Sequence, residues 1–358
     1  MTAPLVDRPT VIAKTRPYAR IAVIGAGAWG TALASVARRA GRDVTLWGRD
    51  EAVVRSINGE NRNNRYLPEI DLPPGIRATT DMAEALDGAD AVMLVTPSHT
   101  VREISRAVAG HLEDRTAIAL CAKGIEIGTG RLLANVAAEE MPGHPVGAIS
   151  GPTFAHETAK AFPTAVTVAF DFSHEDRIKP GESTAARFAL SLSSETFRPY
   201  ISDDLTGVEI GGAVKNVIAI ACGMMTGAGF AENTRAALIA RGMDEMKALA
   251  EVLGGRRETI TGLSGAGDLT LTCSSQTSRN MSLGIQLGQG IARDECFEGR
   301  PVVVEGEVNA VSVMDLAQKT GVSMPICEAV YRVLHEDADL RASFAHLWSR
   351  PIMAEPKA

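Results

Sequence analysis

The sequence predicts an α/β fold in which a doubly wound N-terminal domain precedes an all-α C-terminal domain. Up to about residue 203, apolar strand-like runs alternate with helical patterns, which is typical of a parallel sheet covered by helices. Beyond that residue the chain shows helical periods broken by glycine clusters. We therefore expect a sheet domain over 20–203 and a helical domain over 204–350, with tails at 1–19 and 351–358.

The composition excludes several classes of partner. The chain has 358 residues, and its formal net charge of −7 provides no overall basic field for nucleic acid or an anionic membrane. Aromatic residues make up only 4%, too few for the stacking platforms that bind single strands. The longest uncharged stretch, 217–231, is shorter than the roughly 20 apolar residues of a membrane span and is expected to be a buried core helix. An anionic small ligand must therefore be held by a local cluster of cations.

The cysteines and the N-terminus indicate the compartment. The 5 cysteines are widely spaced and form no C-x-x-C pair, which indicates a reduced cytosolic protein without structural zinc. Residues 1–18 include basic side chains but lack the apolar core of a secretory signal. We expect a flexible tail there, with an organellar transit segment as the alternative, and a cytoplasmic protein.

One βαβ unit opens the sheet domain. It consists of a strand from Arg20, a glycine-rich turn, a helix that ends at Gly41 and a second strand over 44–47. The charged segment 171–182 contains a Pro-Gly pair and is predicted to be an exposed loop. Further strands are expected at 91–95, 117–121, 146–150 and 165–170, with helices at 82–86, 100–108 and 131–140.

Helical periods dominate the second domain. Only the PVVVE run at 301–305 has the composition of a strand, and no internal repeat is evident. The expected helices lie at 208–221, 235–253, 280–287, 308–319 and 325–335.

A glycine fingerprint, Gly25-Ala-Gly27-Ala-Trp-Gly30, follows the first strand and precedes a helix. Gly25 would make the tight turn, Gly27 would let backbone N–H groups approach a pyrophosphate, and Gly30 would let the helix pack closely. The pattern alone is weak, and a tight turn without a ligand is the alternative. Its position at the start of an α/β domain favours a Rossmann-like dinucleotide site.

The end of the second strand normally reads the adenosine ribose, and Arg49 and Asp50 follow that strand here. An acid suits the 2′-hydroxyl of NAD, whereas an arginine suits the 2′-phosphate of NADP. Arg49 lies closer to the strand end, which favours a site that tolerates NADP. For Asp50, a position that simply faces solvent is about as good an explanation as a contact with the ribose.

Two lysines are candidate ligand-binding cations. Lys123 follows the strand at 117–121, at the sheet edge where open α/β folds bind ligands, and an ordinary surface lysine is the alternative. Lys215 shares a helix face with Gly211 and Gly212, which indicates that a cofactor or another backbone approaches closely. Because its neighbours are apolar and no acid lies one turn away, Lys215 would lose hydration and its pKa would fall, as in a general acid/base. A core-helix lysine that extends to solvent is the alternative.

Two turns of the second domain carry further polar side chains. Asp268 follows the glycine-rich turn at 264–267, where capping of the next helix is the commoner role. Ser278, Arg279 and Asn280 begin a helix, and a hydroxyl, a guanidinium and an amide at that place form a candidate phosphate site. Plain capping with an exposed arginine is the alternative.

In this order the sites resemble those of bacterial NAD(P)-dependent sn-glycerol-3-phosphate dehydrogenases. The resemblance extends from about Ile21 to about His335 and rests on the stretches GAGAWGTALA, LWGRD, TPSH, AKGIE, SGPTFA, GGAVKNVIAIACGM, ARGMDEM, GAGDLTLTC, SRN and VVEG. That family has a Rossmann-type N-terminal domain and a helical C-terminal domain, with catalysis between them. The resemblance implies metal-free hydride transfer between NAD or NADP and the pair dihydroxyacetone phosphate and sn-glycerol 3-phosphate. It also suggests a role in glycerophospholipid synthesis, and a homodimer is plausible.

The resemblance further implies residue roles. Lys215 would bind the substrate and exchange the proton on its C2 oxygen, and Lys123 and Arg279 would contact both substrate and cofactor. Ala28 stands where the family often has serine, so only its backbone contact carries over. The other substrate-binding positions would be Gly151, Thr153, Asp268, Ser278 and Asn280. The other cofactor-binding positions, with those of the fingerprint, would be Gly25, Gly27, Ala28, Trp29, Gly30, Arg49, Ala155, Val303 and Glu305.

Two alternatives share parts of this pattern. A 3-hydroxyacid or 6-phosphogluconate dehydrogenase has the same architecture and a lysine base, and the SRN and GAGD segments argue against it. A dinucleotide-sensing protein without catalytic activity would retain the sheet domain. It has no need of a desolvated lysine, a nearby acid and a phosphate site together.

Overall fold

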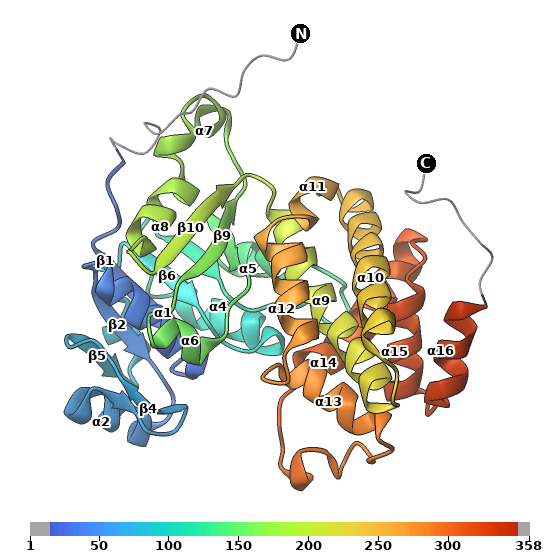
Figure 1. Cartoon of the computed structure of the whole chain (residues 1–358). Helices are drawn as coiled ribbons and strands as arrows, with labels where there is room; N and C mark the ends of the chain where they lie inside the picture. Colours follow the sequence, from blue (N-terminus) through green and yellow to red (C-terminus); the bar gives the residue numbers. More distant parts are fainter. Residues whose placement is uncertain (1–14, 350–358) are drawn as a thin grey trace. The chain divides into compact units, whose positions relative to one another are not determined.

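The computed structural model describes residues 15–349, so the predicted tail at 351–358 and most of the tail at 1–19 lie outside the described residues. The chain divides into two compact units (Figure 1). The first contains Leu132–Glu209 and the chain up to Lys123, and the second contains Gly124–Arg131 and the chain from Ile210 onward. The sequence placed the boundary at 203/204, a few residues earlier, and assigned Gly124–Arg131 to the sheet domain.

An eight-stranded sheet forms the centre of the first unit (Figure 1). In spatial order its strands are β10 (Phe197–Ser202), β9 (Thr164–Phe170), β8 (Val146–Ser150), β7 (Ala117–Leu120), β6 (Ala91–Leu94), β1 (Arg20–Ile24), β2 (Asp43–Trp47) and β5 (Ile76–Thr79). All neighbours are parallel except β8 and β9, which pair antiparallel. Chain order reverses at β1, between β2 and β6, and ligands of open α/β sheets bind beside such a point. The predicted doubly wound α/β architecture is confirmed.

Helices cover both faces of this sheet. One layer comprises α1 (Ala28–Arg39), α2 (Glu51–Glu60) and α8 (Thr184–Leu192), and the other comprises α3 (Met82–Leu86), α4 (Val101–Ala109) and α5 (Leu133–Glu140). Successive residues of a strand point to opposite faces. In β1, Ile21 and Val23 therefore pack in the first layer, whereas Ala22 and Ile24 pack in the second. Burial on both faces explains why the central strands are apolar along their length.

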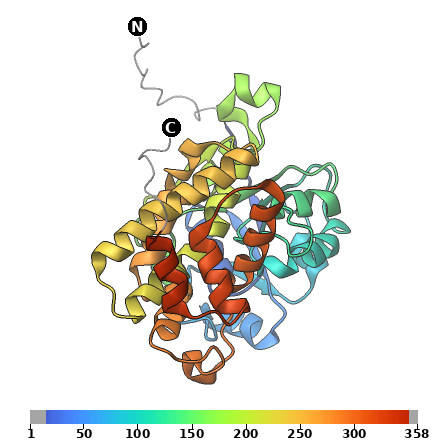
Figure 2. The same ribbon diagram turned by 90° about the vertical axis from the view of Figure 1, so that its right-hand side faces the viewer.

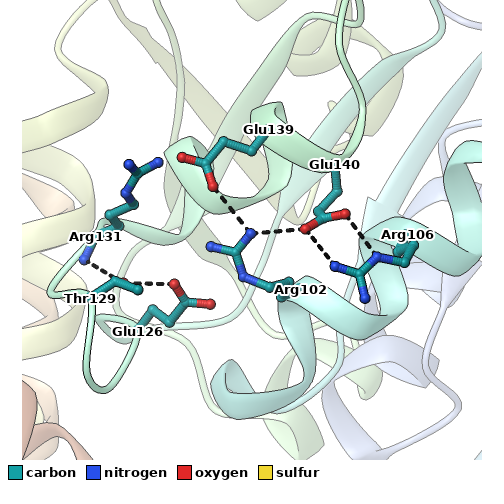
Figure 3. Close-up of polar contacts among 7 residues, drawn as sticks. All are labelled: Arg102, Arg106, Glu126, Thr129, Arg131, Glu139 and Glu140. Atoms are coloured by element: carbon teal, nitrogen blue, oxygen red, sulfur yellow. Dashed lines mark hydrogen bonds and ion pairs between the residues drawn. The ribbon is translucent and has the colours of Figure 1, made fainter.

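Four charged side chains join α4 to α5 (Figure 3). Glu140 accepts hydrogen bonds from Arg106 at 3.0 Å and from Arg102 at 2.8 Å, and Arg102 also reaches Glu139 at 3.1 Å. The Arg106 and Arg102 guanidinium groups lower the pKa of the Glu140 carboxyl. Because the folded state favours the ionised form, this contribution to stability is present at neutral pH and is lost as the pH falls below the usual range of a glutamate.

The structure adds elements that the sequence did not predict. They include β5, β10 and a separate antiparallel pair formed by β3 (Arg62–Asn63) and β4 (Leu67–Asp71). β10 lies at the sheet edge, where its proline is tolerated. The predicted loop at 171–182 is wrong, because the segment contains α7 (His174–Ile178) and a 3₁₀ turn, η2 (Pro180–Glu182). Ser173 and Asp176 form a capping box that starts α7, a signal that the Pro-Gly pair obscured.

The second unit is built of helices (Figures 1 and 2). They are α9 (Leu205–Gly227), α10 (Glu232–Val252), α11 (Arg257–Ile260), α12 (Asp268–Ser274), α13 (Arg279–Gly288), α14 (Glu305–Thr320), α15 (Pro325–His335) and α16 (Leu340–Trp348). Over residues 210–349 no β-strand occurs, and the PVVVE run has no regular secondary structure before its last residue, Glu305, which begins α14. The predicted all-α character of the second domain is confirmed.

Helix α9 is the apolar core helix of this unit. Within residues 15–349 it is the one helix long and apolar enough to cross a membrane by length and composition, and 94% of its apolar window is buried inside the chain. Its first residues, up to Glu209, belong to the first unit, and the remainder belongs to the second.

Glycines let α9 and α13 touch backbone to backbone. A Cβ on Gly223 would lie 2.3 Å from the Met281 carbonyl oxygen, and one on Gly284 would lie 2.2 Å from the Ile220 carbonyl oxygen. The same holds earlier in α9, where a Cβ on Gly211 would lie 2.7 Å from the Ser264 carbonyl oxygen. Of the two partners considered for Gly211, a cofactor or another backbone, the structure places another backbone there.

Candidate functional site

The fingerprint forms an open cradle at the end of β1. Gly25 has a φ of +127°, and its N–H donates to the Trp47 carbonyl oxygen at 3.0 Å. A Cβ on Gly30 would lie 1.8 Å from the Gly25 carbonyl oxygen, so these two glycines close the turn tightly. Gly27, the N-cap of α1, would place a Cβ where no atom lies within 4 Å. The backbone there is open at a helix N-terminus, which fits the pyrophosphate of a dinucleotide.

Apolar residues lie beside this cradle. Ala28, Trp29 and Ala155 all pack against a small cluster that contains Ala32 and Ala159. Ala155 is the first residue of α6 (Ala155–Ala159), which lies next to α1. The structure therefore brings together three of the residues expected to line the nucleotide.

The residues after β2 have distinct environments. Arg49 is exposed and follows Gly48, where a Cβ would lie 2.6 Å from the Ala26 Cβ of the fingerprint. Asp50 caps α2 by accepting the Ala52 N–H at 2.8 Å and pairs with Arg65 at 2.5 Å. The Arg65 hydrogen bond and the Ala52 N–H lower the pKa of the Asp50 carboxyl. The structure thus gives Asp50 a structural role that neither sequence-based reading of it included.

Lys123, Gly151 and Thr153 meet at the carboxyl ends of two neighbouring strands. Lys123 follows β7, and its Nζ donates to the Gly151 carbonyl oxygen at 3.3 Å. The Thr153 hydroxyl donates to the same oxygen at 3.3 Å. Three substrate-binding candidates of the first unit are therefore adjacent.

In the second unit, Lys215 of α9 lies in a buried polar cluster with two residues of α12. Its Nζ is 3.0 Å from Asp268 Oδ1 and donates to the Thr272 hydroxyl oxygen at 2.8 Å. That hydroxyl is also 3.2 Å from Asp268 Oδ1. The side chains of Lys215 and Asp268 are only 8% and 2% exposed. Since a buried ion pair is costly to form, its presence indicates a functional site.

The partners of Lys215 correct two expectations. The capping role considered for Asp268 is wrong, because Gly267 is the N-cap of α12 and the Asp268 carboxylate points to Lys215. No acid lies near Lys215 along its own helix, but α12 supplies Asp268. The Asp268 carboxylate stabilises the ammonium form of Lys215. A π-helical turn, η3 (Leu263–Gly267), precedes Asp268, and such turns are frequent at functional sites.

A cysteine adjoins this cluster without taking part in it. Burial and the neighbouring Cys222 raise the pKa of the Cys273 thiol well above its usual value. The thiol therefore stays protonated and is a poor nucleophile.

Residues 278–280 divide into exposed and buried groups. The Ser278 hydroxyl caps α13 by accepting the Met281 N–H at 3.3 Å, as expected, and Arg279 is exposed. Asn280 is buried, donates to Asn216 Oδ1 at 2.9 Å and accepts the Gly306 N–H at 2.9 Å. The Asn280 amide thus joins α9, α13 and α14. Because these contacts occupy its N–H and its oxygen, Asn280 has fewer hydrogen-bonding groups available to a ligand than the sequence indicated.

Two residues of these networks were not predicted. Asn216 donates to Glu305 at 3.3 Å, which links that cofactor candidate to α9, and Thr272 completes the Lys215 cluster. Asn216 directly follows Lys215 in the chain. Thr272 lies one helical turn after Asp268, so helical spacing alone could have predicted Thr272. Val303, in the segment before α14, is 52% exposed.

Comparison with known proteins places this chain. Residues 20–176 match the family described as NAD-dependent glycerol-3-phosphate dehydrogenase N-terminus, and residues 204–345 match the corresponding C-terminus. A glycerol-3-phosphate dehydrogenase (NAD(P)+) of Rhodospirillum rubrum is 47% identical over 335 residues, covering 94% of this chain and 93% of that protein. The glycerol-3-phosphate dehydrogenase (NAD(P)+) of Caulobacter vibrioides is 45% identical over 338 residues, covering 94% of this chain and 99% of that protein.

A solved structure agrees with these matches. The crystal structure of glycerol-3-phosphate dehydrogenase from Coxiella burnetii has 39% identity and a TM-score of 0.84, covering 93% of this chain and 99% of that one. The resemblance found in the sequence motifs is thereby confirmed over both units. The chain belongs to the NAD-dependent glycerol-3-phosphate dehydrogenase family.

Proposed function

We propose that this chain interconverts dihydroxyacetone phosphate and sn-glycerol 3-phosphate with NAD(P)(H), and that it supplies glycerol 3-phosphate for glycerophospholipid synthesis. The observation that carries the proposal is the buried cluster of Lys215, Asp268 and Thr272 in a chain of this family. Oxidation of a secondary alcohol needs a base at the C2 oxygen, and a phosphorylated substrate needs a separate anion site.

The first unit would hold the dinucleotide. Gly27 and the N-terminus of α1 would receive the pyrophosphate, with the backbone of Ala28 and the side chains of Trp29 and Ala155 beside it. Arg49 would face the adenosine ribose. When bound, the cofactor supplies or accepts the hydride. The remaining proposed cofactor contacts are Gly25, Gly30, Lys123, Arg279, Val303 and Glu305.

Lys215 would hold and move the proton. In the reducing direction its ammonium donates a proton to the C2 oxygen, and in the oxidising direction its amine accepts one. Asp268 would stabilise the ammonium form, and Thr272 would fix the position of Nζ. Because all three are buried, the proton is shielded from exchange with bulk water.

Arg279 and the N-terminus of α13 would hold the substrate phosphate. Arg279 is exposed and makes no ion pair among residues 15–349, so its guanidinium is available to an anion. It stands at the start of a helix, whose dipole favours a phosphate. Lys123, Gly151, Thr153, Ser278 and Asn280 are the further proposed substrate contacts, with Asn280 acting mainly through the order it imposes on α13.

The proposal is tested with purified protein and dihydroxyacetone phosphate. We expect substrate-dependent oxidation of NADPH or NADH, measured as loss of absorbance of the reduced nicotinamide. 6-Phosphogluconate and a 3-hydroxyacid with NAD(P)+ are the controls, because related dehydrogenases with the same architecture use them. Activity with one of these controls and none with dihydroxyacetone phosphate would overturn the substrate assignment.

Arg279→Ala is expected to raise KM for dihydroxyacetone phosphate by about tenfold to a hundredfold, because a charge-assisted contact to the phosphate is lost. Steady-state kinetics at saturating NADPH measure this change. Arg300→Ala is the matched control, since Arg300 is exposed and pairs with Glu298 at 3.0 Å. An unchanged KM in the Arg279 variant would contradict the phosphate site.

We also propose a cytoplasmic homodimer. All five cysteines are free and buried, which suits a reducing compartment. Sedimentation equilibrium of the purified chain measures the state of assembly, and a monomer at all concentrations would contradict it.

A further inference from the structure

Within residues 15–349 the chain crosses between the two units at three places. It leaves the first unit after Lys123, returns to it at Leu132, and leaves it again after Glu209. Hinges between compact units lie in a few residues of this kind, at the ends of elements and in the segments that connect them. Lys123, a proposed ligand-binding cation, stands directly at the first crossing.

A hydrogen bond joins the second crossing to the third. Glu209, in the part of α9 that belongs to the first unit, accepts the Ala134 N–H of α5 at 2.8 Å on Oε1. Leu132, the N-cap residue of α5, makes no side-chain capping hydrogen bond. The carboxyl of Glu209 therefore supplies from α9 the cap that α5 lacks in its own sequence.

The segment between the first and second crossings is a closed loop. The Glu126 N–H donates to the Arg131 carbonyl oxygen at 2.9 Å, and the Thr129 hydroxyl donates to the Glu126 carboxylate at 2.6 Å (Figure 3). The Arg131 N–H donates in turn to the Thr129 hydroxyl oxygen at 3.2 Å. Because the two ends of the loop are hydrogen-bonded to each other, fixing Leu132 also restrains the backbone that begins after Lys123.

The surroundings of Glu209 disfavour its ionised form. Removal from water, helped by the Asp171 carboxylate, raises the pKa of the Glu209 carboxyl to about 8, although the N–H groups at the start of α5 oppose this shift. The pKa of Asp171 is itself raised by burial and by Asp204, and Arg177 lowers it. At neutral pH the Glu209 carboxyl is therefore mostly protonated, and its carbonyl oxygen still accepts the Ala134 N–H.

We propose that Glu209 is a pH-sensitive hinge clamp, which holds two of the crossings together while its carboxyl is protonated and loosens them when the carboxyl ionises. It is a positioning residue, which acts on Lys123 through the closed loop. In the opened clamp Glu209 has the usual pKa of a glutamate, so the closed clamp binds the proton more tightly. Opening therefore becomes easier as the pH rises from the usual range of a glutamate to about 8, and it levels off above that pH.

Limited digestion of the full chain with trypsin tests the clamp, because trypsin cleaves after Arg131, next to the capped end of α5. We expect this cleavage, normalised to that of a flexible peptide, to become about tenfold faster between pH 6 and pH 8. Glu209→Gln keeps an accepting oxygen and cannot ionise, so its cleavage should stay slow at both pH values. Glu209→Ala lacks the cap and should be cleaved rapidly at both.

Glu103→Gln is the matched control, because Glu103 is an exposed carboxylate of α4, the helix that packs against α5. This variant should keep the pH dependence of the unaltered chain. The same pH dependence in Glu209→Gln would overturn the inference, since another group would then titrate. Slow cleavage of Glu209→Ala at both pH values would overturn it as well, because the hydrogen bond would then hold nothing.

The effect on Lys123 is measured through KM for dihydroxyacetone phosphate, and this part rests on the proposed function. Between pH 6 and pH 8, KM should rise more in the unaltered chain than in Glu209→Gln. An equal rise in both would overturn the action on Lys123. If no variant reduces dihydroxyacetone phosphate while the digestion follows the expected pattern, the proposed function is overturned and the clamp is supported.

Discussion

Lys215→Ala is expected to lower kcat by about a hundredfold or more while NADPH still binds, as for removal of a general acid/base. The C2 oxygen then has no positioned proton donor in the reducing direction. The variant also leaves Asp268 buried without its cation, which costs about 3–5 kcal/mol of stability. Single-turnover kinetics and calorimetric binding of the nucleotide, measured on the same preparation, separate lost chemistry from lost folding.

Lys215→Arg keeps the charge, and with it the ion pair to Asp268, but a guanidinium does not release its proton near neutral pH. We expect this variant to fold and bind nucleotide and still to lose most of its turnover. Lys319→Ala, a change at an exposed lysine of α14, is the matched control and should retain activity. Near-normal turnover of Lys215→Arg would show that another group carries the proton.

The sequence singled out candidate residues one by one, but it did not show how they assemble. Lys215 and Asp268 stand out in the sequence through their apolar and glycine-rich surroundings, yet no local pattern states that α9 and α12 bring them within 3.0 Å. That contact depends on packing between helices distant in the chain. The same reason explains why Asn216 was missed and why Asn280 was assigned to a ligand rather than to a network inside the protein.

Elements of the fold that leave a strong local pattern in the sequence were likewise predictable, and elements without such a pattern were not. Apolar periodicity predicted the central strands and most long helices, because burial on both faces of a sheet leaves a strong signal. β10 was missed because it is an edge strand with exposed residues and a proline. β5 was missed because it is an edge strand of only 4 residues, in which Arg77 is exposed and Thr79 is polar. A glycine cluster in a sequence likewise does not state whether a ligand or another helix comes close.

Gly223→Ala is expected to destabilise the second unit by about 1–3 kcal/mol, although alanine is the better helix former. The added Cβ would lie 2.3 Å from the Met281 carbonyl oxygen and 2.9 Å from Gly284 Cα. Both atoms belong to the backbone of α13, so no side chain can move aside, and the two helices must separate. The loss is measured as a lower midpoint of urea unfolding, followed by circular dichroism.

Gly59→Ala makes the same chemical change in α2, where a Cβ would meet nothing within 4 Å, and it should raise stability by about 0.4–1 kcal/mol. Because both substitutions replace glycine by alanine in a helix, opposite signs of the stability change separate the effect of the helix–helix contact from that of helix propensity. Because α9 carries Lys215 and α13 begins at Arg279, separating these helices should also raise KM for dihydroxyacetone phosphate in the Gly223 variant. Lowered stability with an unchanged KM would show that the position of Arg279 does not depend on this contact, and unchanged stability would contradict the close approach itself.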